Sequence, residues 1–148
     1  MVKIPIGKVK ILKNVMDEEQ INRLPPDVRK EFLKLGMKLD EKTKQHKVHN
    51  DFLSFVKHVW PEFIEGPHHK KISEKFNRLA KGEVKRLIIN MPPRHTKSEF
   101  ASFLLPSWMV GRKPDLKIIQ TTHTTELAIR FGRKAKTLMD SPEYKQVF

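Results

Sequence analysis

Cysteine is absent from this 148-residue chain, and the absence excludes several kinds of chemistry. Without thiols there is no disulfide, no thiolate zinc site and no cysteine nucleophile, so any metal must be bound by oxygen or imidazole ligands. Two histidine pairs, His46 with His49 and His68 with His69, lack a carboxylate in ligand register. We therefore favour metal-free histidines over a zinc site.

Long apolar runs are also missing. The most apolar stretch, residues 100–110, is too short to cross a bilayer and contains Pro106, and the N-terminus lacks the apolar core of a signal peptide. The sequence therefore predicts no membrane role.

Acidic residues are few relative to basic ones. The chain has 17 Asp and Glu against 30 Lys and Arg, a formal charge of +13, and the basic excess is spread along its length. This balance favours a polyanionic partner such as nucleic acid, although a basic protein kept soluble by its charge remains the alternative. A hydrophobic fraction of 38%, with nine Phe and two Trp, suffices for the core of one domain or part of one.

The first 49 residues are predicted to form a basic, partly helical extension. Residues 1–15 alternate apolar and basic side chains and suit either an edge strand or extended chain. A short helix is expected from Asp17 to the Pro25–Pro26 pair, and a second from Asp27 to Gly36. The lysine-rich segment that follows is typical of a solvated connector, so a linker is expected over residues 36–50.

Two helices that pack together are expected next. Asn50 is placed to cap the first helix, which Pro61 ends, and Gly66 with Pro67 opens the second, which Gly82 ends. Their apolar stripes have helical spacing.

Residues 86–120 show a different pattern. Residues 86–90 and 116–120 are short β-branched apolar runs typical of strands buried on both faces. A helical stripe kinked at Pro106 and closed by Gly111 lies between them, and a helix capped within residues 121–125 and ended before Ser141 follows. This alternation predicts a parallel α/β sheet with right-handed crossovers.

The chemistry concentrates at Lys97-Ser98, where the first expected strand has ended and a helix begins. There, backbone N–H groups at the helix N-terminus can face phosphate oxygens, while the Lys ammonium and the Ser hydroxyl suit terminal phosphates and Mg²⁺. The G-x-x-x-x-G-K-[ST] pattern is incomplete, since Met91 and Thr96 occupy the glycine positions. A proline-stiffened turn with Lys97 and Ser98 merely solvated is the alternative.

The order of residues in this segment supports the phosphate-binding interpretation. Residues 85–99, KRLIINMPPRHTKSE, closely resemble the divergent Walker A segment of large terminase subunits, the ATPases that package tailed-phage DNA. The flanking segments, from Phe55 to Gly82 and from Trp108 to Tyr144, agree as well, so the resemblance covers residues 50–148. It departs at Thr96, where family members carry Gly.

The resemblance implies an ATP-driven motor and a fold to go with it. The fold would be an α/β P-loop NTPase of the ASCE, RecA-like class, with a partial parallel sheet over residues 50–148 that stops before Walker B, preceded by the helical region of residues 1–49. ATP and Mg²⁺ would be the cofactors. Lys97 and Arg94 would act on the transferred phosphoryl group, Ser98 would bind Mg²⁺, and His68 or His69 would approach the base. The nucleotide-binding set is Pro93, Arg94, His95, Thr96, Lys97, Ser98, His68 and His69.

The same resemblance implies partners and a setting. These are double-stranded DNA, a portal protein, a procapsid, a small terminase subunit and a homo-oligomeric ring, all in the cytoplasm of the bacterial host. A nuclease domain would lie downstream. No apolar run after Ser98 ends in the paired acids that hydrolysis needs, so we expect this chain alone to bind nucleotide without turning it over.

A second cationic feature lies on the last long helix. Arg130, Arg133, Lys134 and Lys136 form either a solvated face or a DNA-contacting patch. Two functions therefore stay open: a P-loop motor ATPase, with a helicase as its variant, and a non-catalytic basic nucleic-acid-binding module.

Overall fold

The structure, a computed structural model, describes residues 16–148, so the edge strand or extended chain predicted over residues 1–15 lies outside the described part. The chain divides into two compact units, Met1–His46 and Lys47–Phe148.

The first unit is built on helix α1 (Glu18–Arg23) and on helix α2 (Pro26–Asn50) as far as His46, and the last four residues of α2 belong to the second unit. Asp17 precedes α1 as its N-cap, as predicted, and a small core forms around the buried side chains of Ile21 and Leu33. The predicted linker over residues 36–50 is wrong, because α2 continues without a break to Asn50. Its lysines, glutamates and leucines are good helix formers, and a single glycine inside a helix costs only about 1 kcal/mol.

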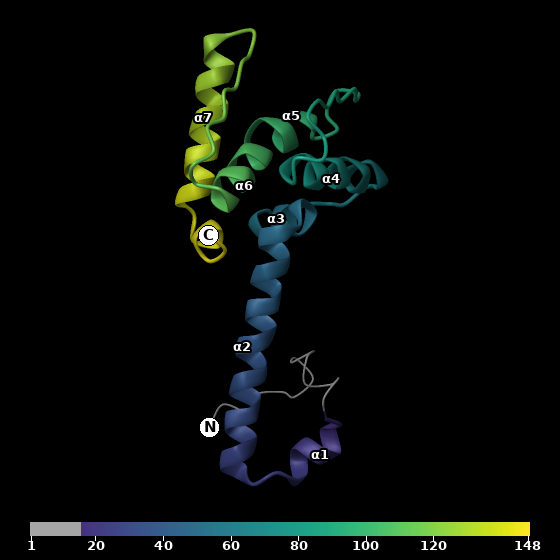
Figure 1. The fold of residues 1–148 in the computed structure, drawn as a ribbon, viewed down its shortest axis with the longest axis vertical. Coiled ribbons are helices and arrows are strands. Elements are labelled where there is room, and N and C mark those ends of the chain that lie inside the picture. Colours follow the sequence, from purple (N-terminus) through teal and green to yellow (C-terminus); the bar gives the residue numbers. More distant parts are fainter. Residues whose placement is uncertain (1–15) are drawn as a thin grey trace. The chain divides into compact units, whose positions relative to one another are not determined.

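The second unit continues with the predicted pair of helices, α3 (Phe52–Val59) and α4 (Pro67–Ala80), which pack together (Figure 1). Asp51, rather than the expected Asn50, caps α3, and its carboxylate accepts a hydrogen bond of 2.8 Å from the backbone N–H of Ser54. Asn77 of α4 donates to the same carboxylate at 2.7 Å and accepts from the Phe52 N–H at 2.8 Å. The start of α3 is thus fastened to the end of α4, which the left-handed Gly82 follows as predicted.

A continuous helical run follows the loop after α4. It comprises α5 (Lys97–Glu99), a π-helical turn η3 (Phe100–Leu104) and α6 (Leu105–Arg112). The irregular turn directly precedes Pro106, whose ring and missing N–H disturb the regular hydrogen-bond ladder. Gly111 lies inside α6 rather than ending it, and a Cβ atom there would approach Tyr144 and Phe148 to 2.6 Å. Its role is therefore close packing.

Helices α7 (Thr125–Asp140) and α8 (Pro142–Lys145) complete the unit, and Thr124 caps α7 within the predicted range. The core centres on Phe52, whose ring meets Phe76, Phe100 and Trp108 edge to face at centroid distances of 5.1, 5.5 and 5.5 Å. The other buried apolar members of this core are Val48, Phe55, Val56, Leu104, Leu105 and Tyr144.

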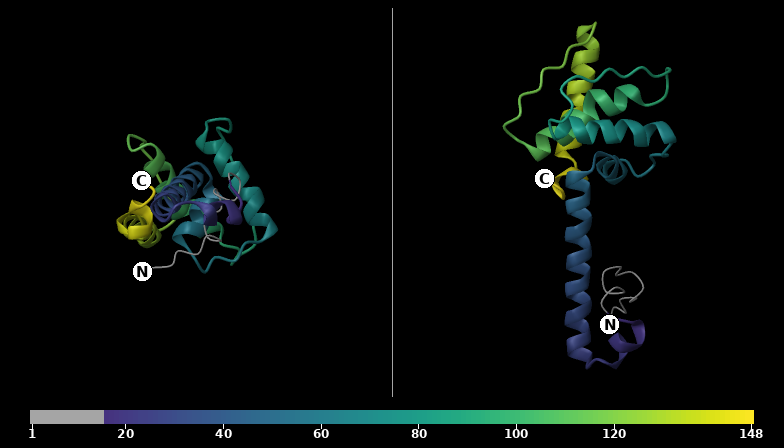
Figure 2. Two further views of the ribbon diagram at one scale, coloured as in Figure 1. Left: turned by 90° about the horizontal axis from the view of Figure 1, so that it is seen from below. Right: turned by 45° about the vertical axis from the view of Figure 1, so that its right-hand side comes forward.

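The predicted parallel sheet is wrong. Residues 16–148 contain no strand, so the α/β P-loop NTPase fold is not present in the described chain. The segments expected as strands, 86–90 and 116–120, run as coil, which Figures 1 and 2 show as ribbon without arrows.

The burial of these two segments also contradicts strands buried on both faces. Ile88 and Ile119 expose 86% and 92% of their surface, whereas Leu87 and Ile89 pack partly against the core. A β-branched run favours extended backbone, but a strand exists only when a second strand pairs with its N–H and C=O groups. No such pairing occurs within residues 16–148. Over the same residues, no helix combines the length and apolar character that crossing a membrane requires.

Candidate phosphate-binding loop and cationic groove

The segment 91–98, called loop 91–98 below, carries two unusual backbone conformations. Arg94 and Thr96 have φ angles of 64° and 59°, and they are the non-glycine residues with positive φ among residues 16–148. The left-handed region costs an L-residue roughly 1–2 kcal/mol, and a β-branched residue such as Thr96 is disfavoured there most. Something in the structure must therefore stabilise this turn.

A helix begins directly after the turn. Thr96 is left-handed and its neighbour Lys97 opens α5 in right-handed conformation, a pairing that turns successive backbone N–H groups toward one point. No side chain caps this helix start, and the first N–H groups of a helix have no acceptor inside it. Lys97 and Ser98 are both exposed. The donors of an anion site are thus available to solvent.

His69 on α4 holds the turn through a chain of hydrogen bonds. Its Nδ1 accepts from the Gly66 N–H at 2.9 Å, and its Nε2 lies 2.7 Å from the Thr96 hydroxyl oxygen. That hydroxyl donates its one hydrogen to the His95 carbonyl at 2.7 Å. His69 must therefore donate from Nε2. The two hydrogen bonds, at Nδ1 and at Nε2, both require the neutral tautomer that carries its proton on Nε2.

The surroundings of His69 also favour the neutral form. The side chain is 5% exposed and packs against the rings of Phe63 and Phe100 at 4.8 and 5.1 Å. Burial lowers the pKa of His69 below its ordinary value of 6.5, and His68 and His95 lower it further, while Glu65 opposes them.

The structure brings the other predicted histidines to the same place. The rings of His68 and His69 lie 3.8 Å apart, and those of His68 and His95 lie 5.6 Å apart. Both nitrogens of His69 are engaged, whereas the buried Nε2 of His68 has no partner within residues 16–148. Of the two residues predicted to approach a base, His68 is the one with an unpartnered ring nitrogen within residues 16–148, and that nitrogen is buried.

Glu99 connects the loop to α7. Its carboxylate binds the Lys134 ammonium at 2.9 Å through both oxygens, and the same ammonium lies 5.1 Å from the centre of the Phe103 ring. Lys134, predicted to contact DNA, is thus already engaged by an acid and an aromatic face.

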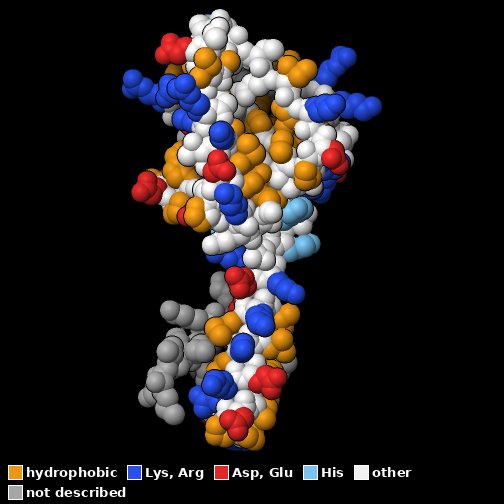
Figure 3. Space-filling view, turned by 90° about the vertical axis from the view of Figure 1, so that its left-hand side faces the viewer, with side chains coloured by type: hydrophobic (Ala, Val, Ile, Leu, Met, Phe, Trp, Pro, Cys, Tyr) orange, Lys and Arg blue, Asp and Glu red, His pale blue; other side chains and the backbone are white. Residues whose placement is uncertain are grey.

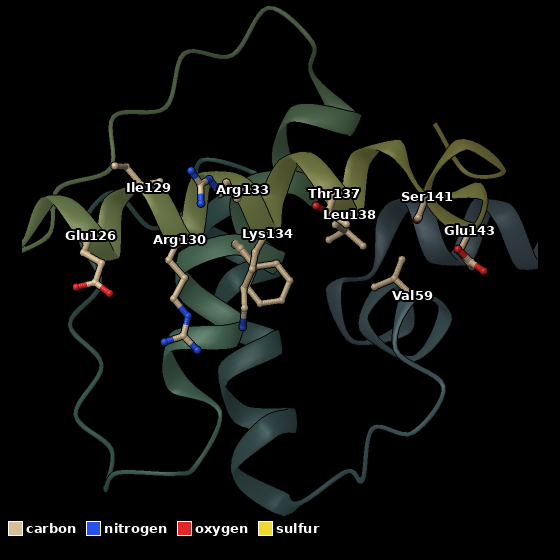
Figure 4. Close-up of a pocket in the computed structure, with 11 residues that line it drawn as sticks. Val59, Glu126, Ile129, Arg130, Arg133, Lys134, Thr137, Leu138, Ser141 and Glu143 are labelled. Atoms are coloured by element: carbon tan, nitrogen blue, oxygen red, sulfur yellow. The ribbon is translucent and has the colours of Figure 1, made fainter.

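A groove of about 1010 Å³ runs along α7 beside these residues. Its apolar lining comes from Val59, Phe103, Ile129 and Leu138, and Figure 3 shows hydrophobic side chains gathered in a hollow with Lys and Arg around it. The cations on its walls are Arg130, Arg133 and Lys134, and Glu126 and Glu143 also line it (Figure 4).

The four predicted DNA-contacting residues do not form one face. Arg130 and Lys134 extend from the same side of α7 in Figure 4, and their guanidinium and ammonium groups approach the groove. Lys136 is exposed and does not line the groove. At about 100° per residue, it lies roughly 200° around the helix from Lys134.

Metal binding by protein side chains alone finds no support. Within residues 16–148 there is no group of three His, Asp or Glu placed to hold a metal ion. A Mg²⁺ ion would therefore depend on the Ser98 hydroxyl, nucleotide oxygens and water. The exposed Ser98 at an uncapped helix start fits that kind of binding.

Comparison with known proteins adds no relative. No protein-family model, no curated protein and no solved structure matches this chain.

The sequence indicates a turn before Lys97 but does not show which residues support it. The bond between His69 and Thr96 joins residues 27 positions apart, and the bond between Glu99 and Lys134 joins residues 35 apart. The one local signal was His69 as the third residue of a helix opened by Gly66-Pro67, where a side chain can reach back to the N-cap N–H.

Proposed function

We propose that loop 91–98 binds the phosphates of a nucleotide, ATP with Mg²⁺, as the nucleotide-binding part of a DNA-packaging motor of the large terminase kind. The observation that carries this proposal is the left-handed Thr96 directly before a helix that opens with Lys97 and Ser98 and has no side-chain cap. Such a turn has an unfavourable backbone conformation that directs backbone N–H donors outward. This is typical of a site that binds an anion.

Each residue of the loop has a role in this proposal. The Lys97 ammonium pairs with the terminal phosphates, the Ser98 hydroxyl reaches Mg²⁺, and Arg94 neutralises charge that develops on the transferred group. Bound Mg²⁺ supplies charge neutralisation of the phosphates and orients them. Pro93 and His95 shape the turn, with His95 Nδ1 2.8 Å from the Pro93 carbonyl oxygen.

The parallel sheet predicted from the sequence is not part of this proposal, because residues 16–148 form none. The proposal depends instead on the loop, the helical run behind it and the support from α4. DNA, the portal, procapsid and small subunit partners, the ring and the host cytoplasm enter through the resemblance of residues 85–99 to large terminases.

Nucleotide binding is tested directly on the purified chain. We expect ATP with Mg²⁺ to protect the fold against thermal unfolding, and Lys97→Ala to abolish this protection without lowering the melting temperature of the free protein. Lys113→Ala, which removes an equally exposed lysine, is the matched control and should keep the protection. Equal protection of the Lys97 variant and the wild type would overturn the proposal.

A second candidate function, binding of nucleic acid without catalysis, is favoured by one observation. Arg130 and Arg133 line the groove, and neither guanidinium makes an ion pair or side-chain hydrogen bond within residues 16–148. Two unpaired cations that line one groove suit backbone phosphates.

The salt dependence of duplex binding tests this candidate. Neutralising Arg130 and Arg133 to Gln should reduce the slope of log affinity against log salt by nearly two. Neutralising Lys134 should change it less, because Glu99 already pairs with that ammonium. Slopes that do not change in either variant would place duplex binding elsewhere on the chain.

A further inference from the structure

His69 lies behind loop 91–98 rather than in it, and none of the roles proposed above requires it. Its ring is nevertheless clamped between two elements: the turn before α4, through the Gly66 N–H, and the loop, through the Thr96 hydroxyl. It also touches Phe63 and Phe100 of the core. Because both nitrogens of this buried imidazole are hydrogen-bonded, a change in its protonation changes the bonds to both elements.

We propose that neutral His69 is a positioning residue that locks Thr96 in the left-handed conformation, and that protonation of His69 releases the loop. This inference rests on the proposed function, since it describes how the phosphate-binding loop is held and regulated. It adds a proton as the regulator of the same site.

The lock follows from the direction of each hydrogen bond. The Gly66 N–H needs an acceptor at Nδ1, and the Thr96 oxygen, whose hydrogen is given to the His95 carbonyl, needs a donor at Nε2. Neutral imidazole with its proton on Nε2 provides both. Protonated imidazole carries a second N–H at Nδ1, which would point at the Gly66 N–H, so one anchor of the ring is lost.

The energetic need for a lock follows from the residue type. A β-branched side chain resists the left-handed region, so Thr96 with φ at 59° returns to ordinary backbone when its support is removed. Glycine adopts this region without penalty. Thr96→Gly should therefore make the lock unnecessary, and this gives the experiment its control.

Electrostatics alone predicts the opposite pH response, which sharpens the test. The ionisable groups around His69 are His68 on α4, His95 on the loop and Glu65 before α4. Hydrogen bonds from Lys57 and Lys70 hold the pKa of Glu65 below its ordinary 4.5, so that carboxylate stays negative above pH 5. A proton gained by His69 would add positive charge behind the loop, and this charge by itself would attract phosphates more strongly. Simple electrostatics thus predicts tighter ATP binding in acid. Release of the lock predicts weaker binding in acid.

The experiment measures the affinity of the full chain for ATP with Mg²⁺ between pH 8 and pH 5 in four proteins. These are the wild type, His69→Phe, Thr96→Gly and the double variant. His69→Phe keeps an aromatic ring in the core and loses both hydrogen bonds. We expect it to weaken binding about 5- to 30-fold at pH 8, the factor that corresponds to the penalty of a left-handed residue.

The effect of His69→Phe in the Thr96→Gly protein decides whether the lock exists. There, His69→Phe should change affinity by less than about threefold, as for independent sites. Relative to Thr96→Gly, the wild type should lose affinity as the pH falls below 6.5. An equally large effect of His69→Phe in both backgrounds, or parallel pH profiles, would overturn the lock.

A second measurement separates the lock from nucleotide binding. Nitrogen chemical shifts of the His69 ring, recorded without nucleotide, report its tautomer, and we expect the proton on Nε2 at pH 8. Thr96→Val removes the hydroxyl but keeps the branched shape, and should shift the ring signals and the backbone signals of loop 91–98. Thr96→Ser should restore both. If ATP does not bind at all, the proposed function fails, while these spectra still confirm or refute the lock.

Discussion

The hydroxyl of Tyr144 donates a hydrogen bond of 2.7 Å to the backbone carbonyl of Ser107 and so fastens α8 to the middle of α6. The Tyr144 side chain is buried, and its ring also meets Phe55 and Phe148. Burial raises the pKa of the Tyr144 hydroxyl above its ordinary value of 10.0, in keeping with a neutral donor. The C-terminal turn is thus part of the core.

Removing that hydroxyl should loosen the second unit. Tyr144→Phe keeps the ring but leaves the Ser107 carbonyl without its donor, so we expect a loss of about 1–2 kcal/mol in the free energy of unfolding. Urea denaturation followed by tryptophan fluorescence measures this loss. A variant as stable as the wild type would show that the bond contributes nothing net.

Two glycines on neighbouring helices should respond in opposite ways to alanine. Gly111→Ala places a Cβ atom 2.6 Å from Tyr144 and Phe148, and overpacking of this kind costs about 1–3 kcal/mol. Gly132 on α7 has nothing within 4 Å of its Cβ position, so Gly132→Ala should stabilise by up to about 1 kcal/mol through helix propensity. Melting temperatures that move in the same direction would contradict this packing.

The Asp51 carboxylate should contribute stability that depends on pH. Burial alone would raise its pKa, but hydrogen bonds from Ser54 and Asn77 outweigh burial, and the pKa lies below the ordinary 3.8. The stabilisation is therefore complete above about pH 4 and is lost as the pH falls through the lowered pKa of the folded state.

Asp51→Asn isolates this contribution. The amide turns an N–H toward one of the donors that Asp51 accepts from, so the variant should be less stable at pH 7 by about 1–2 kcal/mol. The difference from the wild type should shrink as the pH falls below 4. A difference that stays constant down to pH 2 would mean that Asp51 is not the titrating group.

The purified chain should bind ATP without turning it over. The acid nearest to Lys97 and Ser98 in sequence is Glu99, and both of its oxygens bind the Lys134 ammonium, so the ion pair weakens it as a base toward water. A coupled phosphate-release assay at saturating ATP should show no multiple turnover. Sustained turnover that is lost in Lys97→Ala would contradict this expectation.

A companion variant checks the role of that ion pair. Lys134→Met frees the Glu99 carboxylate while keeping an apolar stem against Phe103. If the pair only fastens α7 to the loop, the variant lowers stability slightly, by up to about 1 kcal/mol, and stays inactive. Appearance of phosphate release in this variant alone would show that Lys134 holds Glu99 out of the reaction.

Local sequence signals determined where several helices of this protein begin. Asp17 before α1, Pro67 at the start of α4 and Thr124 before α7 satisfy or spare the free N–H groups at helix starts, and these interactions reach only three or four residues along the chain. The turn and helix start around Lys97, which we propose bind phosphate, were predictable for the same reason, since they are contiguous in sequence. Whether it binds nucleotide remains a prediction.

Tertiary structure decided the rest. The runs 86–90 and 116–120 favour extended backbone, but a strand needs a partner from elsewhere in the chain, and within residues 16–148 none pairs with them, so the predicted sheet does not form. Likewise, Thr96 alone would avoid a left-handed turn, and the support we propose for it comes from His69 on α4, which packs against Phe63 and Phe100. Capping and propensity act between near neighbours, whereas strand pairing and the support of a strained loop depend on contacts that no local pattern encodes.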